Sequence, residues 1–398
     1  MERASFRAAS RRRFLTVLCF GAAGAALAAC AAPTPTATPA KQHAAPVVPP
    51  APAAPGARPT GVGLITAKYQ GEAAVLDGAG ATFPAVLYSK WYDEYFKLTG
   101  VKVNYQSIGS GGGIKGISDQ TVDFGATDGP MTDEQMKAAR GGEILHIPMA
   151  LGAVVPTYNI PELKTPMKLT SDTLAGIFLG DITMWNDARL VADNPDLAAV
   201  NKDITTVHRS DGSGTTFVFV DYLSAVSKTW KDRIGVATSV NWPHGLGAKG
   251  NEGVAGEVKS NLYSIGYVEY VYAAKNRLGF AWMQNQSGAF IEPTLESVSA
   301  AAAGAAANIA PDLRASIVNA PGPRAYPISG FTWLLAYRTM KDLARAQALT
   351  RVMWWSIHDG QKFAGDLGYV PIPDPIVEKA ADKILSIHVN DRRAFPHS

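Results

Sequence analysis

Cysteine is scarce in this sequence: two occur in 398 residues, Cys19 and Cys30. Cys19 lies in a segment that we expect to be removed, so one thiol remains and no disulfide can form within the mature chain. The fold must therefore be stabilised by buried apolar side chains. About 320 residues follow the N-terminal segments described below, enough for one large or two medium domains with well-buried interiors.

The sequence also lacks clustered histidines and a marked excess of charge. Its seven histidines show no metal-ligand spacing, so we predict no metal and no other cofactor. The formal net charge is +3, but residues 1–29 contain five Arg and one Glu, which leaves about −1 on the remainder. A basic surface is therefore not indicated, and we expect no nucleic-acid partner.

The N-terminus has an apolar run, Phe14 to Leu27, that is shorter than a transmembrane helix normally requires. Arginines precede it, and it ends in Leu-Ala-Ala-Cys30, which looks like a bacterial lipobox. We predict that residues 1–29 are a lipoprotein signal peptide and that Cys30 is lipidated, the alternative being an ordinary secretory signal. Residues 10–15 also resemble a twin-arginine signal, so Sec and Tat export both stay open.

Residues 30–68 are dominated by Ala, Pro, Thr, Val and Gly. Such a segment cannot bury enough apolar area to offset the entropy of ordering, and we predict a disordered, partly polyproline-II tether. At ~3.1 Å per residue it would reach on the order of 100 Å. This reach suits a globular part that stays attached to a membrane.

The globular part, from Tyr69, repeats a pattern of strand, glycine turn and helix. Residues 75–76 begin a strand, 77–84 form a turn, and 85–98 predict a helix with Leu87, Trp91, Tyr95 and Leu98 on one face. The pattern returns as a strand at 101–105, a turn at 109–113, a helix at 114–120 and a strand at 122–126. It predicts an α/β fold with a mostly parallel sheet.

Two later segments have a clear local preference. Residues 204–207 predict a strand that ends in the polar turn 208–215. The following residues, 216–220, are β-branched and aromatic, and propensity alone favours a strand there. The alanine-rich stretch 295–310 predicts a helix.

Polar glycine turns at the carboxyl ends of strands favour anion binding, because they present free backbone N–H groups at helix starts. The candidate groups are Thr82 and Phe83 in the first turn, Ser110 in the second, and Arg209, Ser213, Gly214 and Thr215 in the last. Each turn alone has a simpler interpretation. Glycine and serine fill tight turns for backbone reasons, Arg209 with Asp211 fits a surface ion pair, and Asp128 fits a turn former.

Six motifs in order resemble the substrate-binding proteins of bacterial phosphate-specific ABC transporters, from about Leu76 to the C-terminal region. They are residues 78–84, 103–112, 122–128, 209–215, 242–251 and 265–270. The resemblance implies a two-lobed periplasmic-binding-protein fold of the type II-like kind. Each lobe would be a mostly parallel sheet flanked by helices, and the ligand would lie in the cleft between the lobes. It places 69–152 and 326–398 in lobe I and 153–325 in lobe II, with closure on binding.

The resemblance also implies a ligand set for phosphate: Thr82, Phe83, Ser110, Asp128, Arg209, Ser213, Gly214 and Thr215, with Asp211 holding the Arg209 guanidinium. It further implies a helix that opens at Ser213, against the propensity of that segment. The expected partners are inorganic phosphate and ABC permease subunits with a separate ATPase. We expect a monomer, anchored outside the cytoplasm through the lipid on Cys30, and no enzyme activity.

Asp128 would accept a hydrogen bond from a protonated oxygen of phosphate and reject sulfate, which has no proton. Arsenate also keeps its proton, so the sequence does not exclude it as a ligand.

The first alternative function is a phosphatase-like hydrolase of phosphate esters with Ser110 or Ser213 as nucleophile, although no histidine spacing suggests a base. The second is a lipoprotein that scavenges or senses phosphate without transport. A nucleotide site is disfavoured because the P-loop pattern ends in Gly-Lys-Ser/Thr, whereas Lys115 here follows Ile114 and precedes Gly116.

Overall fold

The protein is described by a computed structural model that covers residues 65–306 and 309–396. The predictions for the signal peptide, Cys30 and almost all of the tether lie outside these residues. Within the described ranges, no helix combines the length and the apolar character that a membrane span requires.

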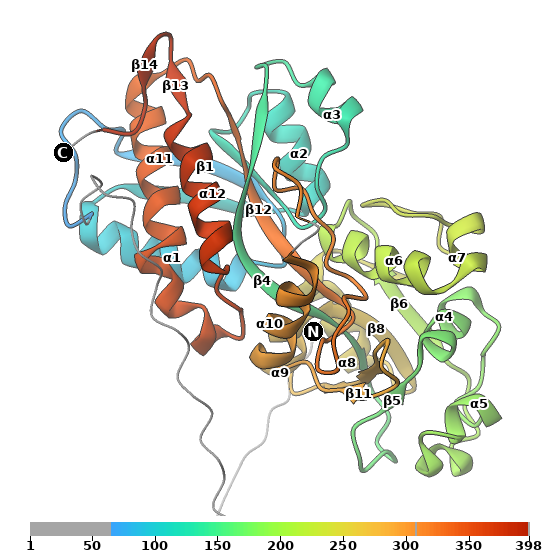
Figure 1. The fold of residues 1–398 in the computed structure, drawn as a ribbon. Coiled ribbons are helices and arrows are strands. Elements are labelled where there is room, and N and C mark those ends of the chain that lie inside the picture. Colours follow the sequence, from blue (N-terminus) through green and yellow to red (C-terminus); the bar gives the residue numbers. More distant parts are fainter. Residues whose placement is uncertain (1–64, 307–308, 397–398) are drawn as a thin grey trace, which may run out of the picture. The chain divides into compact units, whose positions relative to one another are not determined.

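A nine-stranded sheet organises these residues, in the order β2-β1-β3-β12-β4-β8-β6-β7, with β9 paired to the end of β4 (Figure 1). Two small sheets, β11-β10-β5 and β13-β14, lie outside it. The strands are β1 (Val75–Gly80), β2 (Lys102–Ser107), β3 (Phe124–Thr127), β4 (Ile144–Tyr158), β5 (Lys168–Leu169), β6 (Thr205–Arg209), β7 (Leu246–Ala248), β8 (Ser264–Glu269), β9 (Gly279–Phe280), β10 (Trp282–Gln284), β11 (Phe290–Ile291), β12 (Ser329–Tyr337), β13 (His388–Val389) and β14 (Arg392–Arg393).

Strand β4 belongs to both halves of the large sheet. Its first part, up to Ala153, pairs with β12, and from Val154 onward it pairs with β8. All fifteen of its residues are buried, so the strand lies inside the core along its whole length. Figure 1 shows β4 as one long strand that runs from the region of β12 to the region of β8. A single extended segment thus connects the two sets of strands.

Strand directions agree with the predicted α/β class and add one feature to it. The pairs β1–β2, β1–β3, β6–β7 and β6–β8 are parallel, as the repeated strand–turn–helix pattern predicts. The long strands β4 and β12 run antiparallel to their neighbours in this sheet. The parallel strands therefore bring their carboxyl ends, and the turns that follow them, to the sheet edges from which helices begin.

Helices cover the strands of each half. Helices α1, α11 and α12 lie together beside β1 and β4, while α6 and α8 pack against β8 (Figure 1). The helices are α1 (Ala85–Thr99), α2 (Ser110–Ser118), α3 (Asp133–Ala138), α4 (Ser171–Leu179), α5 (Ala188–Val191), α6 (Gly214–Val226), α7 (Lys228–Arg233), α8 (Gly250–Ser260), α9 (Tyr270–Asn276), α10 (Leu295–Ala305), α11 (Leu343–Ile357) and α12 (Asp374–Leu385), with 3-10 turns η1 (Pro195–Ala199), η3 (Asp359–Phe363) and η4 (Gly365–Leu367).

Helix α1 forms where the apolar spacing predicts it. Leu87, Trp91 and Tyr95 are fully buried, and Gly100 ends the helix in the left-handed region with φ 72°. Only glycine adopts that conformation without steric cost, so its N–H can bond back to the Phe96 carbonyl at 2.7 Å. Leu98 is an exception to the prediction, because it is 37% exposed and does not join the buried face.

The strand preference of residues 216–220 is wrong, because this segment lies in helix α6. Ser213 caps the helix by accepting a hydrogen bond from the Thr216 N–H at 3.0 Å. Phe219 then stacks on Tyr267 of β8, with ring centroids 4.3 Å apart and planes 8° from parallel. Helix capping and burial against the sheet outweigh an intrinsic propensity difference of less than about 1 kcal/mol per residue.

Candidate anion-binding site

The first turn places Thr82 and Phe83 between the end of β1 and the start of α1. Both are buried. The Thr82 hydroxyl oxygen accepts hydrogen bonds from the backbone N–H of Asn251 at 3.2 Å and from its side-chain Nδ2 at 2.7 Å. The Tyr369 hydroxyl donates to the Phe83 carbonyl at 2.7 Å. The turn is thereby attached both to α8 and to the C-terminal part of the chain.

The second turn brings Ser110 to the first position of α2, earlier than the predicted helix start at residue 114. Ser110 has no exposed surface. Its Oγ accepts hydrogen bonds from the backbone N–H of Gly214 at 2.9 Å and of Asp128 at 3.3 Å. The neighbouring Gly111 N–H donates to the Gly212 carbonyl at 2.9 Å. Turns that are a hundred residues apart in the sequence thus lie in direct contact.

Arg209 and Asp211 form an ion pair in which the arginine side chain is buried and the aspartate side chain is 14% exposed. Arg209 Nε donates to Asp211 Oδ1 at 2.8 Å and Nη2 donates to Oδ2 at 2.5 Å, the parallel arrangement typical of guanidinium and carboxylate. Burial by itself would raise the pKa of Asp211, but the hydrogen bonds and charge of Arg209 lower it below its ordinary value. Because the Arg209 side chain is 1% exposed, the surface ion-pair interpretation is wrong.

The remaining guanidinium nitrogen, Nη1, reaches the Thr215 hydroxyl at 3.5 Å in the first turn of α6. The first N–H groups of a helix have no partner within it and bond to groups outside it. In α6 the Gly214 N–H donates to Ser110 Oγ and the Thr216 N–H donates to Ser213 Oγ, so these two donors already have partners in the site. Ser213, Gly214 and Thr215 are all buried at this helix start. The structure therefore places neutral hydrogen-bond donors beside Arg209, a cation whose charge is neutralised by Asp211.

Asp128 lies at the end of β3 and is 2% exposed. Its Oδ1 is buried and makes no hydrogen bond with the described residues. Burial raises the pKa of Asp128 to about 7, and the nearby Thr332 hydroxyl and the charge of Arg209 oppose that rise. The carboxyl also lies against Gly214, where an added Cβ would come within 2.6 Å of Asp128 Oδ2. This is a carboxyl inside a group of hydrogen-bond donors, not a turn former at the surface.

The structure brings the predicted ligands together. Hydrogen bonds, or direct neighbours in the chain, connect Thr82, Phe83, Ser110, Asp128, Arg209, Asp211, Ser213, Gly214 and Thr215 in one buried network. That each of them contacts an anion stays a prediction. Two neighbouring residues, Asn251 and Thr332, are not among the predicted ligands. Gly250 and Asn251 open a helix after a strand, as the other turns do, and this pattern would have indicated Asn251.

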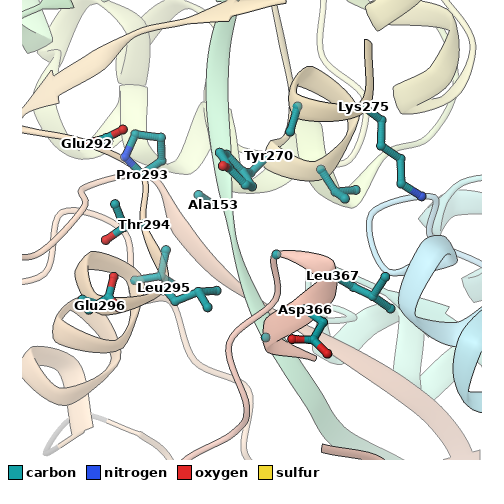
Figure 2. Close-up of a pocket in the computed structure, with 15 residues that line it drawn as sticks. Ala153, Tyr270, Lys275, Glu292, Pro293, Thr294, Leu295, Glu296, Asp366 and Leu367 are labelled. Atoms are coloured by element: carbon teal, nitrogen blue, oxygen red, sulfur yellow. The ribbon is translucent and has the colours of Figure 1, made fainter. Parts of the chain in front are cut away.

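A separate pocket of about 610 Å³ lies outside this network (Figure 2). Figure 2 shows Lys275 on one side of it and three carboxylates, Glu292, Glu296 and Asp366, along the remainder. An excess of carboxylates disfavours an anion by charge repulsion. The buried network therefore remains the candidate anion site.

The fold and the site define a class. Residues 66–359 match the model of the PBP superfamily domain, and the chain belongs to that superfamily. A solved high-affinity periplasmic phosphate-binding protein, PfluDING, with bound phosphate, has the same fold: its TM-score is 0.62 at 20% identity, over 78% of this chain and 93% of that one. This comparison confirms the predicted fold class.

Within the class, the chain belongs to the family of PstS phosphate-binding proteins. It is 45% identical to the PstS protein of Xylella fastidiosa (strain 9a5c) over 305 residues, 76% of this chain and 83% of that protein. It is also 45% identical to the PstS protein of Haemophilus influenzae over 303 residues, 76% of this chain and 90% of that protein. The resemblance inferred from the six motifs is confirmed.

The raised pKa of Asp128 predicts a pH-dependent stability. Because the folded state holds this proton more tightly than the unfolded state, the free energy of unfolding falls as pH rises from about 4 to about 7. Asp128→Asn removes this contribution. We expect the variant to have a higher free energy of unfolding than the parent in thermal unfolding without phosphate. This increase should be larger at about pH 8 than at about pH 5, by up to about 3 kcal/mol.

The matched control for this experiment is Asp93→Asn, since Asp93 is an exposed carboxylate of α1. We expect similar small effects of this change at both pH values. An Asp128→Asn gain that is equal at both pH values would show that Asp128 titrates normally in the folded protein.

Proposed function

We propose that this protein binds inorganic phosphate outside the cytoplasm and delivers it to the permease of an ABC importer. The family supports the assignment, because its members are phosphate-binding proteins. The observation that supports the ligand is the buried Asp128 carboxyl among hydrogen-bond donors, with an oxygen that no described group satisfies. Such a site suits an anion that brings a proton of its own.

The charge balance of the site argues in the same direction. Arg209 is already paired with Asp211, so the pair adds little net positive charge. Attraction for an anion must then come from many short hydrogen bonds in a buried site. A fully deprotonated anion would place a bare oxygen against Asp128, with charge repulsion and an unpaired acceptor as the result. We propose that Asp128 selects phosphate over sulfate for this reason.

A binding role suits the two serines better than hydrolysis. The Ser110 hydroxyl oxygen accepts from two backbone N–H groups, and the Ser213 hydroxyl oxygen caps α6. A nucleophilic serine needs a base that removes its proton, whereas these contacts place N–H donors around the oxygen. We therefore propose that neither serine is a nucleophile and that the protein binds phosphate without turnover.

The first test is titration calorimetry on the protein after unfolding, dialysis and refolding to remove bound anion. We expect one phosphate per chain and discrimination against sulfate approaching ~10⁴-fold. Asp128→Asn should reduce that discrimination at least about tenfold, while Asp93→Asn should preserve it. Equal binding of both anions, or of neither, would contradict phosphate capture. A variant as selective as the parent would remove Asp128 as the cause.

We further propose that the ligand is enclosed by two lobes, 69–152 with 326–398 and 153–325, joined in part by β4. The switch of β4 from β12 to β8 after Ala153 supports this boundary. Because lobes that close on a ligand make the molecule more compact, we expect phosphate to reduce the radius of gyration in small-angle scattering. Sulfate serves as the control, and an unchanged radius with saturating phosphate would contradict closure.

We also propose that Cys30 is lipidated and anchors the protein to the cell membrane. The lipobox-like sequence before Cys30 and the tether-like composition of 30–68 support this proposal. We expect mass spectrometry of the membrane fraction to show a chain that begins at Cys30 with a diacylglycerol attached, and Cys30→Ser to release the protein from membranes. An unmodified Cys30 in a secreted protein would instead indicate an ordinary signal peptide.

A further inference from the structure

Asn251 lies at the centre of the candidate site, although it is not one of the predicted ligands. It is the second residue of α8 and has no exposed surface. Its side chain lies between Thr82, which precedes α1, and Thr215, in the first turn of α6. One buried amide therefore contacts predicted ligands from two turns that are far apart in the sequence.

The orientation of this amide follows from its third partner. Asn251 Oδ1 accepts a hydrogen bond from the backbone N–H of Glu269 at 2.8 Å. A backbone N–H can only donate, so the carbonyl side of the amide must face Glu269 and the NH₂ side must face the threonines. Nδ2 accordingly donates to Thr82 Oγ1 at 2.7 Å and to Thr215 Oγ1 at 3.0 Å.

These bonds determine what each threonine hydroxyl can offer. A hydroxyl has two lone pairs and one hydrogen. Thr82 Oγ1 accepts from both the backbone N–H and the Nδ2 of Asn251, and Thr215 Oγ1 accepts from Asn251 Nδ2 and Arg209 Nη1. With both lone pairs engaged, each hydroxyl is left with its hydrogen to donate. An anion requires donors and no acceptors at such positions.

Ser110 has the same arrangement, supplied by the backbone. Its Oγ accepts from the N–H groups of Asp128 and Gly214. All three hydroxyls are therefore restricted to donation, and the carboxyl of Asp128 remains beside them as an acceptor for a proton on the ligand. For Ser110 the restriction depends on the main chain and cannot be removed by one substitution. For each threonine, one of the two accepted bonds comes from the Asn251 side chain, and the other comes from the Asn251 backbone N–H or from Arg209.

We propose that Asn251 is a positioning residue for phosphate binding: by engaging the lone pairs of Thr82 and Thr215, it makes both hydroxyls donors toward the anion. This inference rests on the proposed phosphate site. It explains why a neutral amide is buried where a lysine would add attraction. A cation would orient the same hydroxyls but would also strengthen binding of any anion, whereas an amide orients them without changing the charge that Asp128 uses for selection.

The test is a thermodynamic cycle on phosphate affinity by titration calorimetry. Asn251→Ala should weaken phosphate binding by about 10- to 100-fold, because each threonine hydroxyl loses one of the two donors that hold its hydrogen toward the anion. In a Thr82→Val, Thr215→Val background, which removes the hydroxyls but keeps the shape, the same change should alter affinity less than about threefold. With Ser at both positions, which restores the hydroxyls, the large effect of Asn251→Ala should return.

Asn194→Ala is the matched control. Asn194 is also buried, and its amide bonds to the backbone of Lys168 and Leu190 away from the site. We expect this change to lower the melting temperature without phosphate and to leave phosphate affinity unchanged. If Asn251→Ala does not fold, Asn251→Asp keeps the shape and presents acceptors to the threonines, and it should also weaken binding with a loss that the valine background reduces.

The outcomes separate this inference from the proposed function. A parent protein that does not bind phosphate contradicts the function itself. A parent that binds phosphate, with the same loss from Asn251→Ala in the valine background as in the parent, overturns the positioning role alone. In that case Asn251 would act by supporting the fold and not through the two hydroxyls.

Discussion

The ion pair between the buried Arg209 guanidinium and Asp211 determines the chemistry of the rest of the site. A guanidinium stays charged when it is buried, so it must be paired, and Asp211 holds it in two parallel hydrogen bonds. Pairing leaves the site with little positive charge to attract an anion. Binding must then depend on neutral donors, and neutral donors are effective only when their directions are fixed. The packing of the turns against one another supplies that direction.

Two carboxyl groups in this site have pKa shifts of opposite sign. The pKa of Asp211 is lowered because Arg209 bonds to it directly. The pKa of Asp128 is raised because burial dominates and Arg209 acts on it only through space. Asp211 is therefore a carboxylate that holds Arg209 in place, whereas Asp128 is a carboxyl that can share a proton with a ligand. The different environments, and not the residue type, give the two aspartates their different roles.

Much of the site could be predicted because its turns have local signatures. Glycine turns after strands identified Thr82, Ser110 and Thr215 as candidate groups, and the family resemblance, against local propensity, implied the helix that begins after Ser213. Asn251 also follows a strand at a helix start, but that pattern does not show its partners at positions 82, 215 and 269, which give the residue its importance. The strand preference of residues 216–220 failed for a related reason, since its environment is a buried helix surface against Tyr267.

Local sequence patterns were sufficient for the α/β class, for most of the strands and turns along the chain, and for the kind of group that each turn presents. These properties follow from glycine conformation, apolar spacing and side-chain chemistry, which act over a few residues. Long-range packing buries Asp128 and the Arg209 guanidinium and places Asn251 between two threonines. Hydrogen-bond partners in the site are separated by as many as 286 residues, as Phe83 and Tyr369 are, so packing of the whole chain decides burial and partners.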